Sequence, residues 1–597
     1  MSAPTLANIL ALSLARHTKR AFGLMGNGNA HLIDQLSEAG IVHTEMRHEA
    51  GTVAAADAYT RVSGEIAIAT TTYGAGFTNC LTALAEAAQA RTPLIVAVGD
   101  APSTGPRPWD VDQETLAAGL GVRTYRLATT DIANTVDHAV DYAHRARRPI
   151  VLAIPYDLAA AVTGPDEAEA TGPLSSTEGI DLDDPAVRTA LIAAVLDSPA
   201  RQTSGIVDRG RRQAPMAPDL QQVRAAAQTL AAARRPLILA GHGAHLSGAG
   251  QQLGALADRL GALTATTALA RSIFPEPRFD LGVTGGFGQE LAMAKIAQAD
   301  AVVVVGASLN QFTMRFGELF GAGTSVIRID VDHVPAPRSA HPVTYRLLRG
   351  DAAATLTALL TELSGTVPSL WREDVTGLEP NGALRWRDTG LTSHPDGICA
   401  DGRLDPRAVA SELAHRLPSD RHVTTDGGHF IGWANTRWEV SSPERMIMVG
   451  TAYQTIGLGF ATVAGVATAA PGSTVVLSTG DGGGLMGLAD LETAIRTAAS
   501  CVIVVWNDGA YGAEVHLYGT MGLRQNPMLI PEVDFAGLAT ALGATGIRVE
   551  RLEDLTALDD WQAAGAHGTL LLDCKISRSV VAEYQREIQR VNGLDPH

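Results

Sequence analysis

The sequence predicts an α/β protein built from three doubly wound parallel-sheet domains. Its 597 residues exceed what one hydrophobic core usually serves, so several domains are expected. Short apolar, β-branched runs alternate with helical patterns, and this alternation occurs in three separate parts of the chain. Between those parts lie two proline-containing stretches without periodicity. Together these observations favour three layered domains joined by two linkers.

The first domain is predicted over residues 1–165. The chain opens with an amphipathic helical pattern that leads into a first apolar run. Further runs follow at intervals that leave room for a helix between successive strands. The predicted strands of this domain are Ala21–Leu24, Ile66–Thr70, Leu94–Val98 and Ile150–Ile154.

Two more domains follow, each after a linker. Residues 166–219 are rich in Pro, Ser, Thr and acidic residues and are predicted to be a linker. Residues 220–365 repeat the alternation as a central domain, and residues 366–400 form a second linker. Residues 401–597 form the third domain, which ends in a polar, partly helical tail. The predicted strands are Pro236–Ala240, Ala301–Val305 and Val326–Ile329 in the central domain, and His422–Thr425, Val475–Leu477 and Cys501–Trp506 in the third.

Composition and charge argue against several classes of protein. The net charge of −17 disfavours a nucleic-acid-binding surface and an anionic membrane face. A membrane-spanning helix needs about 18 consecutive apolar residues, and no apolar run of the sequence comes near that length. The N-terminus lacks a signal-peptide pattern. The four cysteines lie far apart without CxxC spacing, as expected of buried thiols in a reducing compartment. We therefore expect a cytoplasmic protein with no nucleic-acid or membrane partner.

The stretch Val475–Glu514 carries the clearest chemical signal. A predicted strand runs into the glycine-rich turn Gly480–Gly484, and the next strand ends in Asn507-Asp508-Gly509. Consecutive glycines before a helix let backbone N–H groups approach a phosphate closely. Asp481 and Asp508 offer the oxygen ligands that Mg²⁺ and Ca²⁺ prefer, at the sheet edge where ligands bind. The alternative is a simple glycine turn with capping acids, which the second motif makes less favoured.

This pairing of motifs resembles the thiamine diphosphate signature, in which GDG precedes an asparagine-containing element. The superfamily includes acetolactate synthases, pyruvate decarboxylases and benzoylformate decarboxylases. The resemblance implies bound thiamine diphosphate and Mg²⁺, and it identifies the three domains as pyrimidine-binding, central and diphosphate-binding. Asp508 stands where the family usually has Asn, which adds a negative charge beside the diphosphate. The implied metal ligands are Asp481, Asp508 and the Ala510 carbonyl, and the glycines implied near the diphosphate are Gly480, Gly482 and Gly483.

A segment of the first domain resembles the family's activating motif. Within Met46–Gly51, Glu49 stands at the position of the glutamate that meets N1′ of the aminopyrimidine, and Ala54–Arg61 continues the match. Burial in an apolar pocket raises the pKa of a carboxyl group, so that it can share a proton with a ring nitrogen. That exchange favours the imino form of the cofactor, which removes the proton from C2 of the thiazolium. The alternative is a surface Glu that interacts favourably with a helix N-terminus.

Other positions of the first domain resemble cofactor- and substrate-facing residues. The turn Gly74–Asn79 resembles the family's GPGxxN, so Gly74 and Asn79 are expected at the cofactor, with a plain tight turn as the alternative. Asn27 falls where relatives carry a substrate-facing Asp, Ser or Gly, which leaves the substrate open. Gln113 resembles the glutamine of the synthases' FQE segment.

Two loops of the third domain also resemble the family's site. Asp426–His429 resembles the loop that touches the diphosphate, which makes Gly428 and His429 candidate contacts; a purely structural His429 is an equal alternative. In Thr451–Gly457, Ile456 matches the side chain that bends the cofactor, and the Gln454 carbonyl would hold its 4′-amino group. A branched, stiff side chain suits such a fulcrum, with ordinary core packing as the alternative.

Three residues that follow Asn507-Asp508-Gly509 are candidates for roles on the substrate side of the site. Glu514 lies six residues after Asp508, where pyruvate and indolepyruvate decarboxylases carry an active-site Glu. There it would deliver a proton to the reacting carbon or relay one to the product. The alternative is an exposed helix acid. Tyr511 and His516 are neighbouring candidates.

The central domain carries only a weak flavin signal. Gly241-His242-Gly243 follows a predicted strand, but Leu246 stands where a GxGxxG motif needs glycine. Ser308 and Gly285–Gly288 stand where the synthases have Arg and Gly-x-His-Gly. FAD is therefore not favoured, and the domain is predicted to be structural.

The resemblance implies an enzyme that cleaves or forms C–C bonds of 2-oxo acids, as a decarboxylase or a carboligase. Two alternatives are a flavin oxidoreductase of the pyruvate oxidase kind and a non-catalytic paralogue that binds the cofactor. Glu49 and Asp481 lie in different domains, and relatives assemble the site across two subunits. We therefore expect a homodimer or a dimer of dimers, a homotetramer, with shared active sites.

Overall fold

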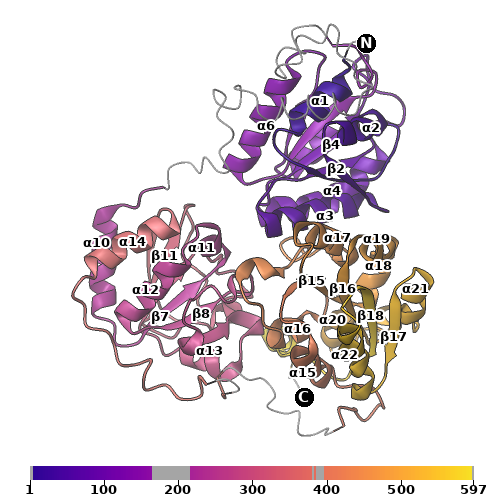
Figure 1. Ribbon diagram of the computed structural model, residues 1–597. Helices are drawn as coiled ribbons and strands as arrows, with labels where there is room; N and C mark the ends of the chain where they lie inside the picture. Colours follow the sequence, from indigo (N-terminus) through magenta and orange to yellow (C-terminus); the bar gives the residue numbers. More distant parts are fainter. Residues whose placement is uncertain (1–3, 164–215, 380–381, 385–395, 595–597) are drawn as a thin grey trace.

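The computed structural model describes residues 4–163, 216–379, 382–384 and 396–594 and contains three lobes (Figure 1). Each lobe holds one six-stranded sheet, and the strand pairs within the sheets run parallel. Helices flank the sheets on both faces, which confirms the predicted fold class (Figure 1). Most of the predicted first linker lies outside the described residues.

The first sheet has the order β2-β1-β3-β4-β6-β5. Its buried strands β3, β4 and β6 correspond to apolar runs of the sequence, whereas the edge strands β2 and β5 are polar and were not predicted. The strands are β1 (Arg20–Gly23), β2 (Val42–Glu45), β3 (Ile68–Thr71), β4 (Ile95–Asp100), β5 (Arg123–Arg126) and β6 (Ile150–Pro155). The helices are α1 (Leu6–Leu14), α2 (Ala30–Glu38), α3 (Glu49–Ser63), α4 (Ala75–Ala90), α5 (Gln113–Gly119) and α6 (Ile132–Ala146).

The central sheet has the order β12-β11-β10-β7-β8-β9. The segment that follows the central domain in the sequence packs against it. The Ser369 N–H donates to the Leu260 carbonyl, and Arg372 forms an ion pair with Asp258 at 3.0 Å. The strands are β7 (Pro236–Ala240), β8 (Leu263–Thr266), β9 (Asp280–Val283), β10 (Ala301–Val305), β11 (Ser325–Asp330) and β12 (Thr344–Arg349). The helices are α10 (Leu220–Ala231), α11 (His242–Leu246), α12 (Gly250–Leu260), α13 (Glu290–Ile296) and α14 (Ala352–Glu362).

The third sheet has the order β14-β13-β15-β16-β18-β17. The helical pattern predicted after the glycine turn is interrupted at Gly487, so that a 3-10 turn separates α18 from α19. The strands are β13 (Arg421–Thr425), β14 (Met446–Ile447), β15 (Thr474–Gly480), β16 (Ser500–Asn507), β17 (Thr545–Val549) and β18 (Gly568–Lys575). The helices are α15 (Pro406–Arg416), α16 (Ile431–Arg437), α17 (Gly459–Ala469), α18 (Asp481–Met486), α19 (Leu491–Thr497), α20 (Gly512–Glu514), α21 (Phe535–Ala541), α22 (Thr556–Ala563) and α23 (Glu583–Val591).

The first and third domains meet where α3 packs against α17 (Figure 1). Both helices are rich in Ala and Gly, which lets their backbones approach closely. A Cβ atom on Gly465 would lie 2.1 Å from the Ala55 carbonyl oxygen, so only glycine fits there. Asp490 adds a polar contact by accepting the Arg47 N–H at 2.9 Å. The buried apolar side chains of both helices belong to one continuous cluster.

The glycines of Gly241-His242-Gly243 in the central domain serve the packing of two loops. Gly241 and Gly243 pack against Gly306 and Ala307, where added Cβ atoms would come within 2.5 and 2.9 Å of backbone. These glycines therefore allow two loops of the central domain to touch.

No helix in the described ranges is long and apolar enough to span a bilayer.

Candidate active site

Two aspartates stand side by side at the carboxyl edge of the third sheet. β15 and β16 are neighbours in register, with Gly480 opposite Trp506, and Asp481 and Asp508 follow directly after them. The Asp481 carboxylate accepts the N–H groups of Gly482 at 3.0 Å and Gly509 at 2.9 Å. The glycine-rich turn and the Asn-Asp-Gly motif therefore form one connected loop pair, as the sequence predicted.

The aspartate pair is buried and, among the described residues, forms no direct ion pair. Asp481 is 3% exposed and Asp508 is 6% exposed. Burial raises the pKa of both carboxyl groups, and the charge of Asp481 raises the pKa of Asp508 further. Within the described parts of the chain, backbone N–H groups are their hydrogen-bond partners, and neither forms an ion pair. Two adjacent buried carboxylates without a direct ion pair suit a bound divalent cation.

The protein side chains alone do not complete a metal site. Among the described residues there is no group of three His, Cys, Asp or Glu side chains suited to a metal ion. A cation held by Asp481 and Asp508 would therefore need carbonyl and phosphate oxygens to fill its shell. The buried Ala510, whose N–H donates to Asp508 at 3.0 Å, lies in the right loop to offer its carbonyl. The donor set fits Mg²⁺ bound together with a diphosphate.

Bare glycines line the space beside the aspartates. A Cβ atom on Gly482 would lie 2.9 Å from the Tyr511 ring, and one on Gly483 would lie 2.9 Å from Asp426. Gly480 faces the Phe430 ring, where a Cβ atom would come within 2.7 Å. Side chains at these positions would collide with those neighbours, so only glycine lets the loops pack this closely beside the aspartates. The role of this turn in holding a diphosphate stays a prediction.

Asp426 was missed as a site residue by the sequence interpretation. It is buried, burial raises its pKa, and it accepts the N–H groups of Gly427 at 2.7 Å and Gly457 at 3.0 Å. It therefore ties the end of β13 to the segment that contains Ile456. Its position directly after a predicted strand, like that of Asp481, was the available signal.

Ile456 projects from the loop surface. Its side chain is 42% exposed, and it lies over two glycines, with ideal Cβ positions of Gly427 and Gly483 each 3.3 Å from it. Gln454, two residues earlier, adopts a left-handed backbone conformation with φ of 65°. An exposed branched side chain between two glycine-lined loops is the geometry expected of a fulcrum, and it differs from ordinary core packing.

The Ile456 segment is held by charged residues of the first domain. Arg61 in α3 pairs with Asp57 at 2.7 Å and with the fully buried Glu86 of α4 at 3.2 Å. The Arg61 guanidinium also donates to the Met448 carbonyl at 2.9 Å, and the Tyr453 N–H donates to Glu86 at 2.7 Å. These contacts give Arg61, the last residue of the Ala54–Arg61 pattern, a structural role between the two domains. Glu86 takes part in the same contacts, although no sequence motif indicated it.

The first-domain candidates form a second group. Glu49 is the first residue of α3, is partly exposed, and accepts a hydrogen bond from the Asn79 amide at 3.0 Å. Gln113 is buried with its amide engaged by backbone, since it accepts the Gly74 N–H at 2.8 Å and donates to the Gly99 carbonyl at 2.9 Å. Gln113 thus holds the Gly74 turn in place. Asn27 is exposed in the turn after β1.

The two groups do not meet within one chain. In the portion of the molecule that the structure describes, no hydrogen bond or ion pair joins Glu49, Asn79 or Asn27 to the loops of Asp481 and Asp508. Contacts between the two domains run instead through α3, α4 and α17.

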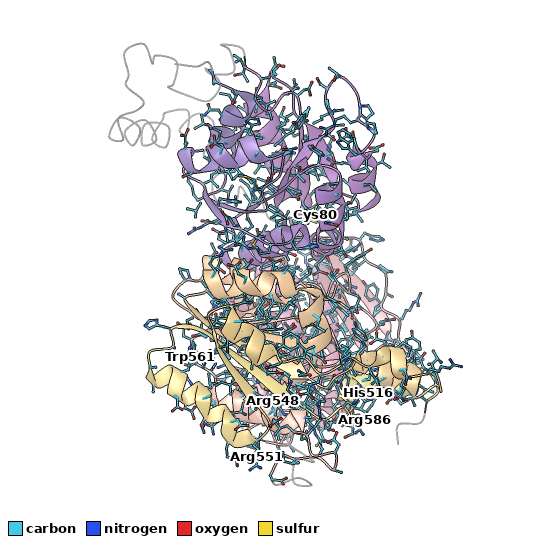
Figure 2. All side chains as sticks on the ribbon, turned by 90° about the vertical axis from the view of Figure 1, so that its right-hand side faces the viewer. Cys80, His516, Arg548, Arg551, Trp561 and Arg586 are labelled. Atoms are coloured by element: carbon cyan, nitrogen blue, oxygen red, sulfur yellow. The ribbon has the colours of Figure 1, made fainter. Side chains whose placement is uncertain are left out.

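The substrate-side candidates lie beside a buried histidine pair. The rings of His429 and His516 are 4.5 Å apart, and burial lowers the pKa of both, to about 4 for His516. The His429 Nε2 accepts the Ala582 N–H at 2.9 Å, so His429 is neutral with its proton on Nδ1. Glu514 is exposed nearby. His516 and Arg586 are labelled in Figure 2, and the charge of Arg586 contributes to the low pKa of His516.

Comparisons with known proteins place this fold and site in one class of enzyme. Residues 4–117 match the "Thiamine pyrophosphate enzyme, N-terminal TPP binding domain". Residues 223–359 match the central domain of the same family, and residues 426–574 match its C-terminal TPP binding domain. The three matches follow the three sheets of the structure. The chain therefore belongs to the thiamine pyrophosphate enzyme family.

Particular relatives agree with this assignment. The chain is 26% identical over 568 residues to the acetolactate synthase isozyme 2 large subunit of Escherichia coli, covering 92% of this chain and 91% of that protein. It is 26% identical over 627 residues to a sulfoacetaldehyde acetyltransferase of Rhodobacter capsulatus, covering 98% and 97%. A solved 4-hydroxybenzoylformate decarboxylase of Rhodococcus jostii superposes with a TM-score of 0.73 at 20% identity, covering 96% and 99%. At that identity the superposition supports the fold alone.

Proposed function

We propose that this protein is a thiamine diphosphate- and Mg²⁺-dependent enzyme that cleaves or forms the bond next to the carbonyl of a 2-oxo acid. The observation that carries the proposal is the buried Asp481 and Asp508 pair, which forms no direct ion pair among the described residues and lies beside a glycine-lined loop. Family membership supplies the matching cofactor. When bound, thiamine diphosphate supplies the carbon nucleophile and the electron sink for loss of CO₂.

The residues of this chain divide into three roles. Asp481, Asp508 and the Ala510 carbonyl would hold Mg²⁺, beside the glycine-lined turn that holds the diphosphate. Ile456 and the Gln454 carbonyl would orient the pyrimidine, and Glu49 would hold the proton at N1′. On the substrate side, Glu514 would move a proton at the reacting carbon. The remaining contacts proposed for the cofactor are Gly74, Asn79, Gly428, His429, Gly480, Gly482, Gly483 and Tyr511, and those for the substrate are Asn27, Gln113 and His516.

The fate of the substrate carbon is left to experiment. Named relatives include a synthase and an acetyltransferase, and the superposed structure is that of a decarboxylase. The exposed Glu514 favours protonation, and therefore simple decarboxylation, as the first candidate. Nothing in the comparisons supports a flavin, and the central-domain glycines serve loop packing.

We also propose that two copies of the chain complete the site in the cytoplasm. Glu49 and the aspartate pair lie in separate groups within one chain, and large apolar side chains are exposed near each group. A second copy would bring the two surfaces together and cover them. The exposed side chains are Met25, Trp109 and Val111 in the first domain, and Tyr453, Ile456, Met486 and Tyr511 in the third. The four buried free cysteines suit a reducing compartment.

The decisive experiment is a screen of 2-oxo acids with and without aldehyde acceptors. CO₂ and carbon products would be followed for the wild type and for Glu514→Gln, with thiamine diphosphate and Mg²⁺ present. We expect CO₂ release that requires both cofactors, and a changed product ratio in Glu514→Gln. Cofactor binding without turnover of any 2-oxo acid would instead indicate a non-catalytic paralogue. A yellow protein that consumes O₂ with pyruvate would indicate the oxidase alternative.

A further inference from the structure

We propose that helix α23 fixes the two loops on the substrate side of the site, and that Tyr584 is a positioning residue for the Gly428-His429 loop. The proposal extends the proposed function, because those loops carry His429, Glu514 and His516. The helix lies in the tail that the sequence indicated only as polar and partly helical. In the structure it packs between the central and third domains (Figure 1).

Tyr584 holds the first loop through its hydroxyl group. The side chain is 8% exposed, and its O–H lies 3.1 Å from the carbonyl oxygens of both Gly428 and His429. Gly428 has φ of 143°, a backbone conformation that glycine adopts readily, so the loop keeps conformational freedom that the tyrosine contacts restrict. The Ala582 N–H binds the His429 ring at 2.9 Å from the same segment. Both the backbone and the side chain of the loop are therefore fixed from the C-terminal end of the protein.

Two glutamines of α23 hold the second loop. The Gln585 amide donates to the Ala513 carbonyl at 3.3 Å, and the Gln589 amide donates to the His516 carbonyl at 2.6 Å. Both glutamines are buried. The segment Val515–Gly519 is a π-helical turn, a form in which the regular helical hydrogen bonds are displaced. The glutamine contacts stabilise this irregular turn, which directly follows Glu514.

The opposite face of α23 is anchored to the central domain. Arg315 pairs with Glu587 of the helix, and Arg590 forms two hydrogen bonds to Glu318 at 2.8 and 2.9 Å. The Tyr584 ring lies 5.8 Å from both Phe287 and Phe312 of the central domain. Phe287 is the third residue of Gly285–Gly288, where the corresponding motif of the synthases has His. The central domain thus acts on the site by supporting this helix.

The inference is tested first by hydrogen exchange on the full-length protein without added cofactor. Tyr584→Phe keeps the packed ring and removes only the hydroxyl group, so amide exchange in peptides spanning 427–432 should accelerate about fivefold. Gln589→Met should instead accelerate exchange in peptides spanning 513–520. The matched control is Tyr345→Phe, whose hydroxyl donates to the Val334 carbonyl at 3.0 Å in the central domain. It should leave both segments unchanged.

Cofactor and substrate measurements then separate this inference from the proposed function. Tyr584→Phe should weaken binding of thiamine diphosphate with Mg²⁺ by about fivefold and raise KM for the 2-oxo acid, whereas Tyr345→Phe should change neither. Unaltered exchange at 427–432 in Tyr584→Phe would overturn the inference, whatever the activity. A wild-type protein that binds no cofactor would overturn the proposed function, and the exchange experiment would still decide the role of Tyr584.

Discussion

At the scale of single residues, the site combines groups whose charge is set by their surroundings. Asp508 stands where the family usually has Asn, so the loop pair carries two carboxylates instead of one. The charges of Arg578 and Arg403 lower the pKa of Asp508 and offset part of the added repulsion. Beside them, His429 and His516 are kept neutral by burial. The site is therefore electrostatically arranged for a cation at one end and for neutral imidazoles at the other.

Replacement of Glu49 tests the activation of the cofactor. Glu49→Gln keeps the size of the side chain and its contact with Asn79 but removes the acid that we propose shares a proton with the pyrimidine. We expect the rate of CO₂ release to fall by at least about 10²-fold. Steady-state kinetics of the loaded enzyme provides the measurement, and the exposed Glu114→Gln is the control. An unchanged rate in Glu49→Gln would refute this role.

The histidine pair predicts a loss of stability in mild acid. Burial and the charge of Arg586 lower the folded-state pKa of His516 to about 4, below its value of about 6.5 in an unfolded chain. The unfolded state therefore binds the proton more readily, and stability falls as the pH drops from about 6.5 to about 4, by up to about 3 kcal/mol. The burial of Asp481 and Asp508 raises their pKa to about 6 and about 7, which changes stability in the opposite sense over the same range. The His516 contribution is therefore measured as the difference between wild type and His516→Gln in thermal unfolding between pH 7.5 and pH 4.5. His516→Gln should flatten the pH dependence, and the exposed His31→Gln should not.

At the scale of elements, close helix packing joins the domains that carry the two groups of site residues. The contact between α3 and α17 depends on small residues, of which Gly465 is the tightest. Glu49 begins the same α3 whose middle packs on the third domain. Disturbance of this seam should therefore affect both stability and the placement of Glu49.

A single methyl group added at the contact between α3 and α17 should lower the stability of the protein. Gly465→Ala would place its Cβ atom 2.1 Å from the Ala55 carbonyl oxygen, so one helix must shift. We expect a loss of about 1–3 kcal/mol in stability, as is typical of overpacked sites. Gly472→Ala is the matched control, since nothing lies within 4 Å of its Cβ position. Equal thermal midpoints for the two variants would contradict the packing argument.

The sequence predicted the buried strands better than the edge strands, for a physical reason. Pro236–Ala240 and Ala301–Val305 are predicted and observed with the same bounds, because strands covered on both faces are apolar throughout. Val42–Glu45 and Arg123–Arg126 lie at edges, carry polar side chains, and give no comparable signal. The GDG and Asn-Asp-Gly loops were predictable because both follow strongly apolar strands. Glu86 and Tyr584 were not, since their partners are distant in the sequence, whereas Asp426 directly follows a predicted strand and was overlooked.

At the scale of the whole molecule, the proposed site combines surfaces that one chain keeps apart. The apolar side chains near Glu49 and near Asp481 are exposed in the single chain. The isologous dimer that we propose would cover both surfaces twice and create two equivalent sites. Shared sites of this kind make a specific prediction about mixtures of inactive subunits.

Complementation between two inactive variants tests the shared site. Glu49→Gln and Asp481→Asn subunits, co-expressed with different tags and purified through both, should regain up to about half of the wild-type activity, because each mixed dimer contains one intact site. Each variant alone should stay inactive. Absence of recovery in verified mixed dimers would show that Glu49 and Asp481 of the same chain act together.

The Asp57, Arg61 and Glu86 network has a consequence for how this protein would fail. It binds the Met448–Tyr453 backbone from another domain, so the proposed bending of the coenzyme by Ile456 would depend on these contacts. Mild heating or low denaturant should break these contacts between the domains before any of the sheets unfolds. Such a protein would lose its chemistry while its circular dichroism still looked native, with an early inactivation phase that excess coenzyme delays.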